Sequence, residues 1–178
     1  MMTAQNIYDD PDFLAGYEKL DRQVRGLDGA AEWPTLRSML PDLAGRRVVD
    51  FGCGFGWFSR WAGQQGATQV IGIDASTKML ERARNETNSP TIEYRCEDLD
   101  ALDIAPDSTD MAFSSLTLHY LNGLDRFFSM GAQAIVPGGL DRMVEWGPTA
   151  EEVAVHPEKA DDRHRPWFLL MRATRRNA

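Results

Sequence analysis

A glycine-rich turn with an aspartate just before it is the first group of residues that could do chemistry. Residues 48–56 read Val-Val-Asp-Phe-Gly-Cys-Gly-Phe-Gly. Their glycines allow a tight turn and a close approach of the backbone to a ligand. The amides of the helix start that follows suit a negative group, whereas the carboxylate of Asp50 suits a positive one. The turn therefore predicts a ligand-binding loop.

Two classes of ligand compete for this turn. A dinucleotide site requires Gly-x-Gly-x-x-Gly/Ala, and Trp57 stands where the last small residue would pack helix against strand. A carboxylate at Asp50 would also repel a pyrophosphate, whereas the sulfonium and ammonium groups of S-adenosylmethionine are cationic. The residues therefore favour S-adenosylmethionine, and a nicotinamide-dependent oxidoreductase stays as the less favoured alternative.

Two more carboxylates follow the next predicted strands. Asp74 ends a strand at the position from which a carboxylate accepts hydrogen bonds from ribose hydroxyls. Capping of the following helix is its structural alternative, although Ser76 can cap without it. Asp98 follows a third strand and could accept a hydrogen bond from an adenine amino group. An exposed loop carboxylate is the alternative for Asp98.

Residues that could contact or deprotonate a substrate are fewer. His119, just after a fourth predicted strand, is the candidate general base, since its pKa suits proton transfer near neutral pH. A structural hydrogen bond is its alternative. Tyr8, Tyr17 and Tyr120 are candidate substrate contacts, although Tyr17 also lies on an apolar helix stripe. The sequence shows no grouping of His, Cys, Asp and Glu with metal-ligand spacing, so no metal is expected.

Strands that alternate with helices must position these residues. Apolar runs predict strands at residues 47–51, 70–74, 91–95, 110–114 and 167–173. Helices are predicted after the glycine-rich turn, at 76–87 with Met79, Leu80 and Ala83 inward, and within 121–136 with Leu124, Phe127, Phe128 and Ile135 inward. Such alternation implies parallel strands, with ligands at their carboxyl ends. We expect an α/β, Rossmann-like three-layer sandwich: a mostly parallel sheet, helices on both faces and an antiparallel last strand.

Taken together, these motifs resemble the class I S-adenosylmethionine-dependent methyltransferases, in the small-molecule branch of the ubiquinone/menaquinone-biosynthesis type. The motifs are the glycine-rich turn, Gly72–Ser76, Glu97–Leu99, Ser114–Tyr120 and Val136–Gly139. The resemblance implies S-adenosyl-L-methionine as the cofactor and methyl transfer as the activity. It implies that Asp50 and Gly52 hold the methionine part, Asp74 the ribose, and Asp98 with the Leu99 backbone the adenine. The remaining residues implied to bind the cofactor are Cys53, Gly54, Ala75 and Ser114.

The chain divides into two predicted parts. From Asp10 to Arg25, apolar residues recur at helical spacing and predict one helix with a buried stripe: Phe13, Leu14, Tyr17, Leu20 and Val24. A second helix ends near Pro41. We expect residues 1–44 to cover the active site and residues 45–178 to form the methyltransferase domain.

The segment after Gly139 departs from the family pattern, which calls for an apolar fifth strand, a helix and an antiparallel pair of strands. In this chain residues 143–146 follow within a few residues and look more like the family's sixth strand. We predict that a stretch is missing between Pro137 and Met143. The acceptor pocket would then be incomplete, so a non-catalytic S-adenosylmethionine-binding module stays as an alternative to an enzyme.

Composition limits the partners. The formal net charge of −8 disfavours nucleic acid, because phosphate binding needs an excess of Lys and Arg. No apolar run is long enough to span a bilayer, and the first ten residues lack a signal-peptide pattern. The two cysteines are too few for a disulfide framework and fit reduced, cytoplasmic thiols. A small-molecule substrate is favoured, and the sequence leaves the oligomeric state open.

Overall fold

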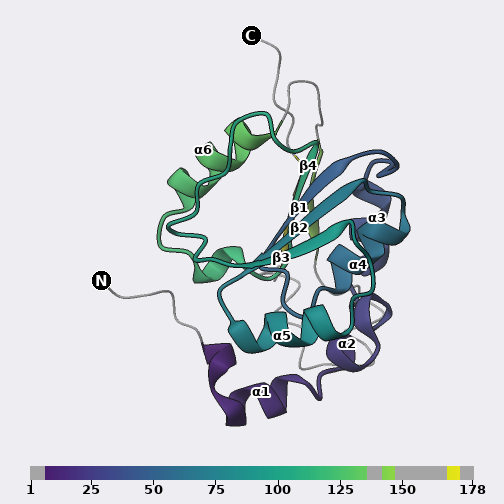
Figure 1. Ribbon diagram of the computed structural model, residues 1–178, viewed down its shortest axis with the longest axis vertical. Helices are drawn as coiled ribbons and strands as arrows, with labels where there is room; N and C mark the ends of the chain where they lie inside the picture. The colour runs from purple at the N-terminus through teal and green to yellow at the C-terminus, as the bar shows by residue number, and fades with distance from the viewer. Residues whose placement is uncertain (1–6, 136–141, 147–167, 173–178) are drawn as a thin grey trace.

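The computed structural model describes residues 7–135, 142–146 and 168–172, and its centre is a sheet of four parallel strands (Figure 1). The strands are β1 (Arg47–Phe51), β2 (Gln69–Asp74), β3 (Ile92–Cys96) and β4 (Met111–Ser114). Their order across the sheet is β3-β2-β1-β4, and the register aligns Val48 of β1 with Val70 on one side and Met111 on the other. The four strands predicted from apolar runs are therefore confirmed to within a residue at each end.

Helices cover both faces of this sheet, as the Rossmann-like prediction requires. They are α3 (Trp33–Met39), α4 (Trp57–Gln64), α5 (Thr77–Asn85) and α6 (Leu124–Ala134). Because side chains alternate along a strand, Val48 and Val70 pack with α3 and α4, whereas Val49 and Phe51 pack with α6. The ring centroids of Phe51 and Phe127 lie 4.9 Å apart. Figure 1 shows α6 on one side of the sheet and α3 with α4 on the other.

The buried faces of two helices differ in how well the sequence predicted them. Met79, Leu80 and Ala83 of α5 are buried, as expected. In α6, Phe127 is buried as expected, but Leu124 and Phe128 are 41% and 43% exposed. The residues buried beside Phe127 are instead Met130 and Ala134, so the stripe that meets the sheet is rotated around the helix. Ile135 follows the helix and forms an isolated bridge with Thr109.

The N-terminal segment is built of short helices rather than the one long helix that was predicted. They are η1 (Ile7–Asp9), α1 (Pro11–Tyr17), α2 (Asp21–Val24) and η2 (Gly26–Gly29). The break comes at Leu20, whose extended backbone starts α2. Phe13, Leu20 and Val24 are 37%, 49% and 66% exposed, so the predicted buried stripe is wrong. Helical spacing of apolar residues indicates amphipathicity, but burial also needs a neighbouring element along the whole stripe.

The strand order reverses at β1. The chain places β2 and β3 on one side of β1 and then crosses to place β4 on the other side. In open parallel sheets a ligand crevice lies outside the carboxyl ends of the strands at such a reversal. The ends of β1 and β4, where the glycine-rich turn and the segment from Ser114 to Tyr120 begin, are therefore the expected place for a site.

The last two strands form a second sheet that is not hydrogen-bonded to the first. β5 (Arg142–Trp146) and β6 (Phe168–Arg172) pair antiparallel in a sheet of two strands. Across the residues that the structure describes, β4 is thus an edge strand of the main sheet, which β6 does not extend. The missing stretch predicted between Pro137 and Met143 falls on residues 136–141, outside the described residues, and stays a prediction. Within the described ranges, no helix combines the length and apolarity needed to cross a membrane.

Candidate active site

A pocket of about 360 Å³ lies at the carboxyl ends of the parallel strands. This volume is typical of small-molecule sites. Its walls come from the glycine-rich turn, the loops after β2, β3 and β4, and the N-terminal helical segment. Every residue predicted to bind the cofactor lines it except Ser114: Asp50, Gly52, Cys53, Gly54, Asp74, Ala75, Asp98 and Leu99. The three predicted substrate residues, Tyr8, Tyr17 and Tyr120, line it as well.

The glycine-rich turn is held against β2 by its own amides. The amides of Gly52 and Cys53 donate to the carbonyl of Ile73 at 2.8 and 3.0 Å, and the amide of Gly54 donates to Asp74 at 2.8 Å. These three amides are therefore engaged within the protein. Gly52 has a φ of +72°, and a Cβ there would lie 2.0 Å from Oγ1 of Thr117. Glycine is thus required at this position both for its backbone conformation and for packing against the loop after β4.

Asp50 is a buried carboxyl group at the floor of the pocket. It is 2% exposed, and its Oδ2 accepts a hydrogen bond from Oγ of Ser59 at 2.6 Å. The pKa of Asp50 is raised to about 7: burial is the main cause, the hydrogen bonds from Ser59 oppose the rise, and the nearby charge of Asp74 adds to it. A buried carboxylate is costly unless it is paired, so this position favours a cationic group of a ligand.

Asp74 stands at the end of β2, with one oxygen bound to the glycine-rich turn and the other to the start of α5. Its Oδ2 accepts from the Gly54 amide at 2.8 Å and its Oδ1 from the Ser76 amide at 2.9 Å. Burial raises its pKa. A carboxylate has about four lone-pair sites and the amides of Gly54, Ser76 and Ala75 take at most three, so Asp74 can still accept a hydrogen bond from a ligand hydroxyl. The helix cap of α5 is Ser76, whose hydroxyl accepts from the Met79 amide at 3.2 Å.

The loop after β3 closes another side of the pocket. Oδ1 of Asp98 accepts from the Asp100 amide at 2.9 Å, which fixes the turn and places Leu99 beneath it, 5% exposed. Cys53 faces the same cavity, and burial raises the pKa of its thiol, which therefore stays protonated. This combination of an apolar side chain, a thiol and a carboxylate suits a flat, hydrogen-bonding ring.

The N-terminal segment closes over the pocket through its tyrosines and Asp9. The hydroxyls of Tyr8 and Tyr120 lie 2.8 Å apart, and the ring centroids of Tyr8 and Tyr17 are 5.0 Å apart. Asp9 accepts from the hydroxyl of Ser76 at 2.6 Å and so ties η1 to the start of α5. Burial raises the pKa of Tyr8, so its hydroxyl keeps its proton and is not a base at neutral pH.

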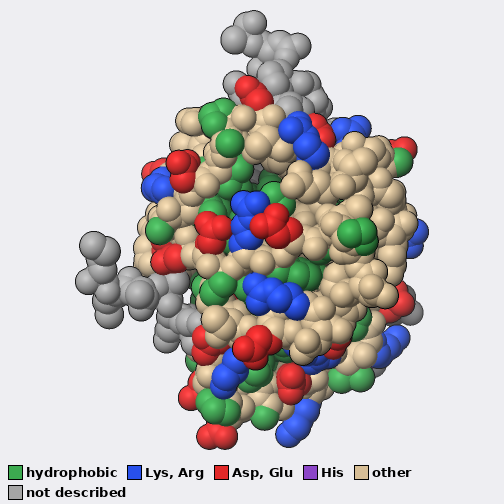
Figure 2. Space-filling view, viewed as in Figure 1, with side chains coloured by type: hydrophobic (Ala, Val, Ile, Leu, Met, Phe, Trp, Pro, Cys, Tyr) green, Lys and Arg blue, Asp and Glu red, His purple; other side chains and the backbone are tan. Residues whose placement is uncertain are grey.

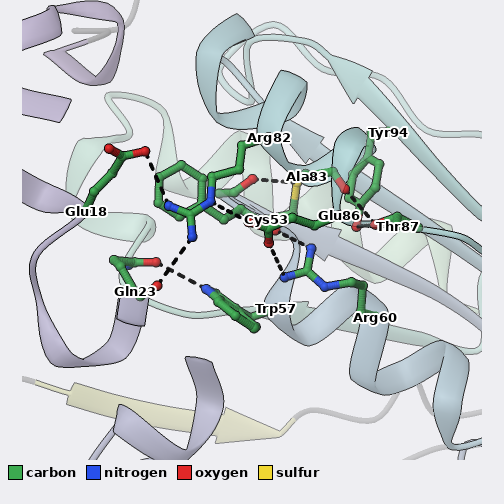
Figure 3. Close-up of polar contacts among 12 residues, drawn as sticks. Glu18, Gln23, Cys53, Trp57, Arg60, Arg82, Ala83, Glu86, Thr87 and Tyr94 are labelled. Atoms are coloured by element: carbon green, nitrogen blue, oxygen red, sulfur yellow. Dashed lines mark hydrogen bonds and ion pairs between the residues drawn. The ribbon is translucent and has the colours of Figure 1, made fainter. Parts of the chain in front are cut away.

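A second set of contacts holds this segment from the side of α5 and α4 (Figure 3). Arg82 of α5 donates to Glu18 at 3.3 Å and to the Gln23 carbonyl at 3.5 Å. The indole nitrogen of Trp57 donates to the side-chain oxygen of Gln23 at 3.3 Å, as Figure 3 shows. The guanidinium of Arg82 also lies 4.1 Å from the ring centroid of Phe55 in the glycine-rich turn. The segment is thus bound directly to the elements that form the pocket.

Two residues of the pocket wall were not predicted from the sequence. Arg22 pairs with the buried Glu32, and it supplies the one basic side chain among the described residues that line the pocket. Thr117 lines the pocket where it packs on Gly52. In the sequence Arg22 reads as one of several charged residues on a surface helix, so no signal separated it from its neighbours.

Two predicted residues have a different outcome. Ser114 does not line the pocket, because its hydroxyl donates to the Phe51 carbonyl at 3.1 Å and joins β4 to β1; Ser115 lines the pocket in its place. The backbone of His119 belongs to η3 (Leu118–Tyr120), but its side chain lies outside the described part of the structure, so its role as a base stays a prediction. Across the described ranges, no cluster of His, Cys, Asp and Glu is arranged to hold a metal ion.

Comparison with known proteins identifies the family to which a chain with this site belongs. A family model described as a methyltransferase domain matches residues 49–140. An S-adenosylmethionine-dependent methyltransferase of known structure from Mesorhizobium loti is 35% identical, with a TM-score of 0.75, over 84% of this chain and 100% of that chain.

Two curated relatives have more specific names. A malonyl-[acyl-carrier protein] O-methyltransferase from Buchnera aphidicola is 37% identical over 93 residues, which are 52% of this chain and 36% of that protein. A ubiquinone biosynthesis O-methyltransferase from Sinorhizobium fredii is 33% identical over 100 residues, 55% of this chain and 40% of that protein. The chain spans about half or less of the length of the curated relatives that it matches. The matched domain, the fold and the pocket agree, and the chain belongs to the S-adenosylmethionine-dependent methyltransferases.

Proposed function

We propose that this chain binds S-adenosylmethionine in the pocket at the strand ends and transfers its methyl group to a small-molecule acceptor. The observation that carries the proposal is the buried carboxyl of Asp50 beneath the glycine-rich turn. Among the described residues no cationic side chain pairs with this carboxylate, and the ligand's ammonium group would supply such a partner. The names of the two O-methyltransferase relatives support a small-molecule acceptor.

The residues present fit each part of this cofactor. When bound, S-adenosylmethionine supplies a methyl group on a sulfonium, and the chain's task is to align it with the acceptor. Asp50 would attract the ammonium, and the guanidinium of Arg22, which has donors beyond those used by Glu32, would bind the carboxylate. Asp74 would accept from the ribose hydroxyls. Asp98 and the backbone of Leu99 would contact the adenine.

The acceptor would enter beside the tyrosines. Tyr8, Tyr17 and Tyr120 line the pocket under the N-terminal segment, and the hydrogen bond between Tyr8 and Tyr120 would exclude water from the reacting groups. We assign residues 1–44 to this covering segment and residues 45–178 to the methyltransferase domain. If the acceptor must lose a proton, His119 is the proposed base.

The cysteines and the surface charge bear on the cellular location and the partners of the protein. The two cysteines are free thiols, Cys53 buried and Cys96 exposed, which supports a cytoplasmic location. Basic side chains on the face drawn in Figure 2 are interspersed with acidic ones and form no continuous patch there. Together with the net charge of −8, this supports a partner other than nucleic acid.

Asp74→Ala is expected to weaken binding of S-adenosylhomocysteine about 10- to 100-fold, because hydrogen bonds to ribose hydroxyls worth about 1–3 kcal/mol are lost. Isothermal titration calorimetry measures the affinity, and circular dichroism checks the fold. Asp28→Ala, at an exposed position that is not part of the pocket wall, is the matched control and should bind like the parent protein. A folded Asp74→Ala protein with parental affinity would reject the ribose role.

Methyl transfer itself is tested with S-adenosylmethionine labelled on its methyl group and a panel of acceptors carrying phenol, carboxyl, amine or thiol groups. We expect label to pass to at least one acceptor, and the transfer to fall in Asp74→Ala in proportion to its loss of affinity at subsaturating cofactor. Tight cofactor binding with no transfer to any member of a broad panel would instead indicate a non-catalytic binding module.

A further inference from the structure

Ser59 is a buried residue of α4 with no direct access to the pocket. It is 0% exposed, and it is absent from the pocket wall, whereas Asp50 is part of that wall. Its hydroxyl donates to Oδ2 of Asp50 at 2.6 Å. A buried hydroxyl aimed at a carboxylate from behind the pocket acts on the carboxylate and not on a ligand.

The other groups around Asp50 do not offset its charge. From β2, Asp74 presents a like charge. From the turn and from β3, Cys53 and Tyr94 feel the charge of Asp50 and bring no positive charge themselves. Arg84 and Arg60 lie near Cys53 and Tyr94, respectively, and not next to the carboxylate. Hydrogen bonding from Ser59 is therefore the influence that favours the ionised form of Asp50.

We propose that Ser59 is a positioning residue for cofactor binding: its hydroxyl fixes the orientation of the Asp50 carboxylate and keeps it charged toward the cationic end of the ligand. This inference rests on the proposed function. It adds a residue outside the glycine-rich turn to the binding machinery.

The proposal has a distinctive consequence for pH. The pKa of Asp50 is about 7 with Ser59 in place, so the carboxyl is protonated and binds a cation poorly below neutral pH. Removing the hydroxyl takes away an influence that lowers this pKa, and the pKa then rises. The loss of affinity on acidification therefore begins at a higher pH in a variant without the hydroxyl.

The test is calorimetric titration of S-adenosylhomocysteine between pH 6.0 and 8.5 with the parent protein and Ser59→Ala. The parent should gain affinity as pH rises through 7. Ser59→Ala should bind about tenfold more weakly at pH 7, because a hydrogen bond to a charged group is lost. At pH 8.5 the difference should shrink to about two- to threefold.

Two further variants keep the result interpretable. Ser59→Cys replaces the hydroxyl with a slightly larger thiol, which is a weaker donor, and it should give an intermediate curve. It provides a second measurement if Ser59→Ala folds poorly. Ser38→Ala removes an exposed hydroxyl of α3 that donates to the Thr35 carbonyl at 2.7 Å, and it should behave like the parent protein.

Equal affinity of Ser59→Ala and the parent, or a loss that is the same at every pH, would overturn the inference and leave the proposed function standing. Absence of binding by the parent protein at every pH would overturn the proposed function, and this inference with it.

Discussion

Asp50→Asn is expected to make the ligand-free protein more stable at pH 8 while it removes most of the affinity for S-adenosylmethionine. The pKa of Asp50 in the folded protein is about 7, against an ordinary value of 3.8. Above pH 7 the folded state must hold a buried negative charge that the unfolded state holds in water. A shift of this size corresponds to about 4 kcal/mol, which the neutral asparagine restores.

The sign of this effect fixes its pH range. Because the pKa is raised on folding, the parent protein loses stability as pH rises from about 4 to 7, and the loss is complete above that range. Chemical denaturation at pH 4 and pH 8 should therefore show a gain for Asp50→Asn at pH 8 and a much smaller gain at pH 4. Asp98→Asn makes the same chemical change in the partly exposed loop after β3 and should show no such gain.

The affinity of Asp50→Asn completes this prediction. The variant loses a charged partner for the ligand cation, and we expect binding to fall about 10- to 100-fold. A variant that is more stable yet binds poorly would identify Asp50 as a residue kept for binding at the expense of the fold. A variant that is less stable at pH 8 and binds normally would show that Asp50 is structural.

Gly52→Ala is expected to destabilise the protein by about 2–5 kcal/mol and to abolish cofactor binding. The backbone at Gly52 has a φ of +72°, which costs an alanine about 1–2 kcal/mol. Its Cβ would also overlap Thr117, whose Oγ1 lies 2.0 Å away, and such overpacking adds about 1–3 kcal/mol. The loop after β4 must move to relieve the overlap, and with it the pocket wall.

Gly54→Ala is the matched control for stability. Gly54 also has a positive φ, +53°, but a Cβ there meets nothing within 4 Å. We expect only the backbone cost of about 1–2 kcal/mol. Unfolding by urea compares the two variants. If Gly52→Ala and Gly54→Ala lose the same stability, the contact with Thr117 is unimportant. If the contact matters, the double variant Gly52→Ala/Thr117→Gly should recover part of the stability that Gly52→Ala loses.

The parts of the fold that the sequence predicted well are those determined by local patterns. Central parallel strands are rich in apolar residues, so the strand at 47–51 and its neighbours could be located within a residue. The exposure of Phe13 and Val24 could not be predicted in this way, because it depends on whether another element covers their side chains. Ser114 and Ser115 show the same limit: side chains alternate along a strand, and a shift of one residue changes which of them faces the pocket.

The residues of the candidate site also divide into those that the sequence predicted and those that it did not. Asp50 and Asp74 could be predicted because their positions at strand ends place them at the ligand crevice whatever the details of packing. Ser59, Arg22 and Thr117 could not, because each acts through a contact that only the folded chain creates: with Asp50, Glu32 and Gly52, respectively.

Calorimetric titration of the parent protein with S-adenosylmethionine, S-adenosylhomocysteine and NAD⁺ tests the central claim most directly. We expect saturable one-to-one binding of the first two ligands at pH 8 and none of the third. The affinity should weaken in Asp50→Asn and Asp74→Ala and stay unchanged in Asp28→Ala. A folded protein that binds NAD⁺ in preference, or that binds neither S-adenosyl compound at millimolar concentration, would contradict it.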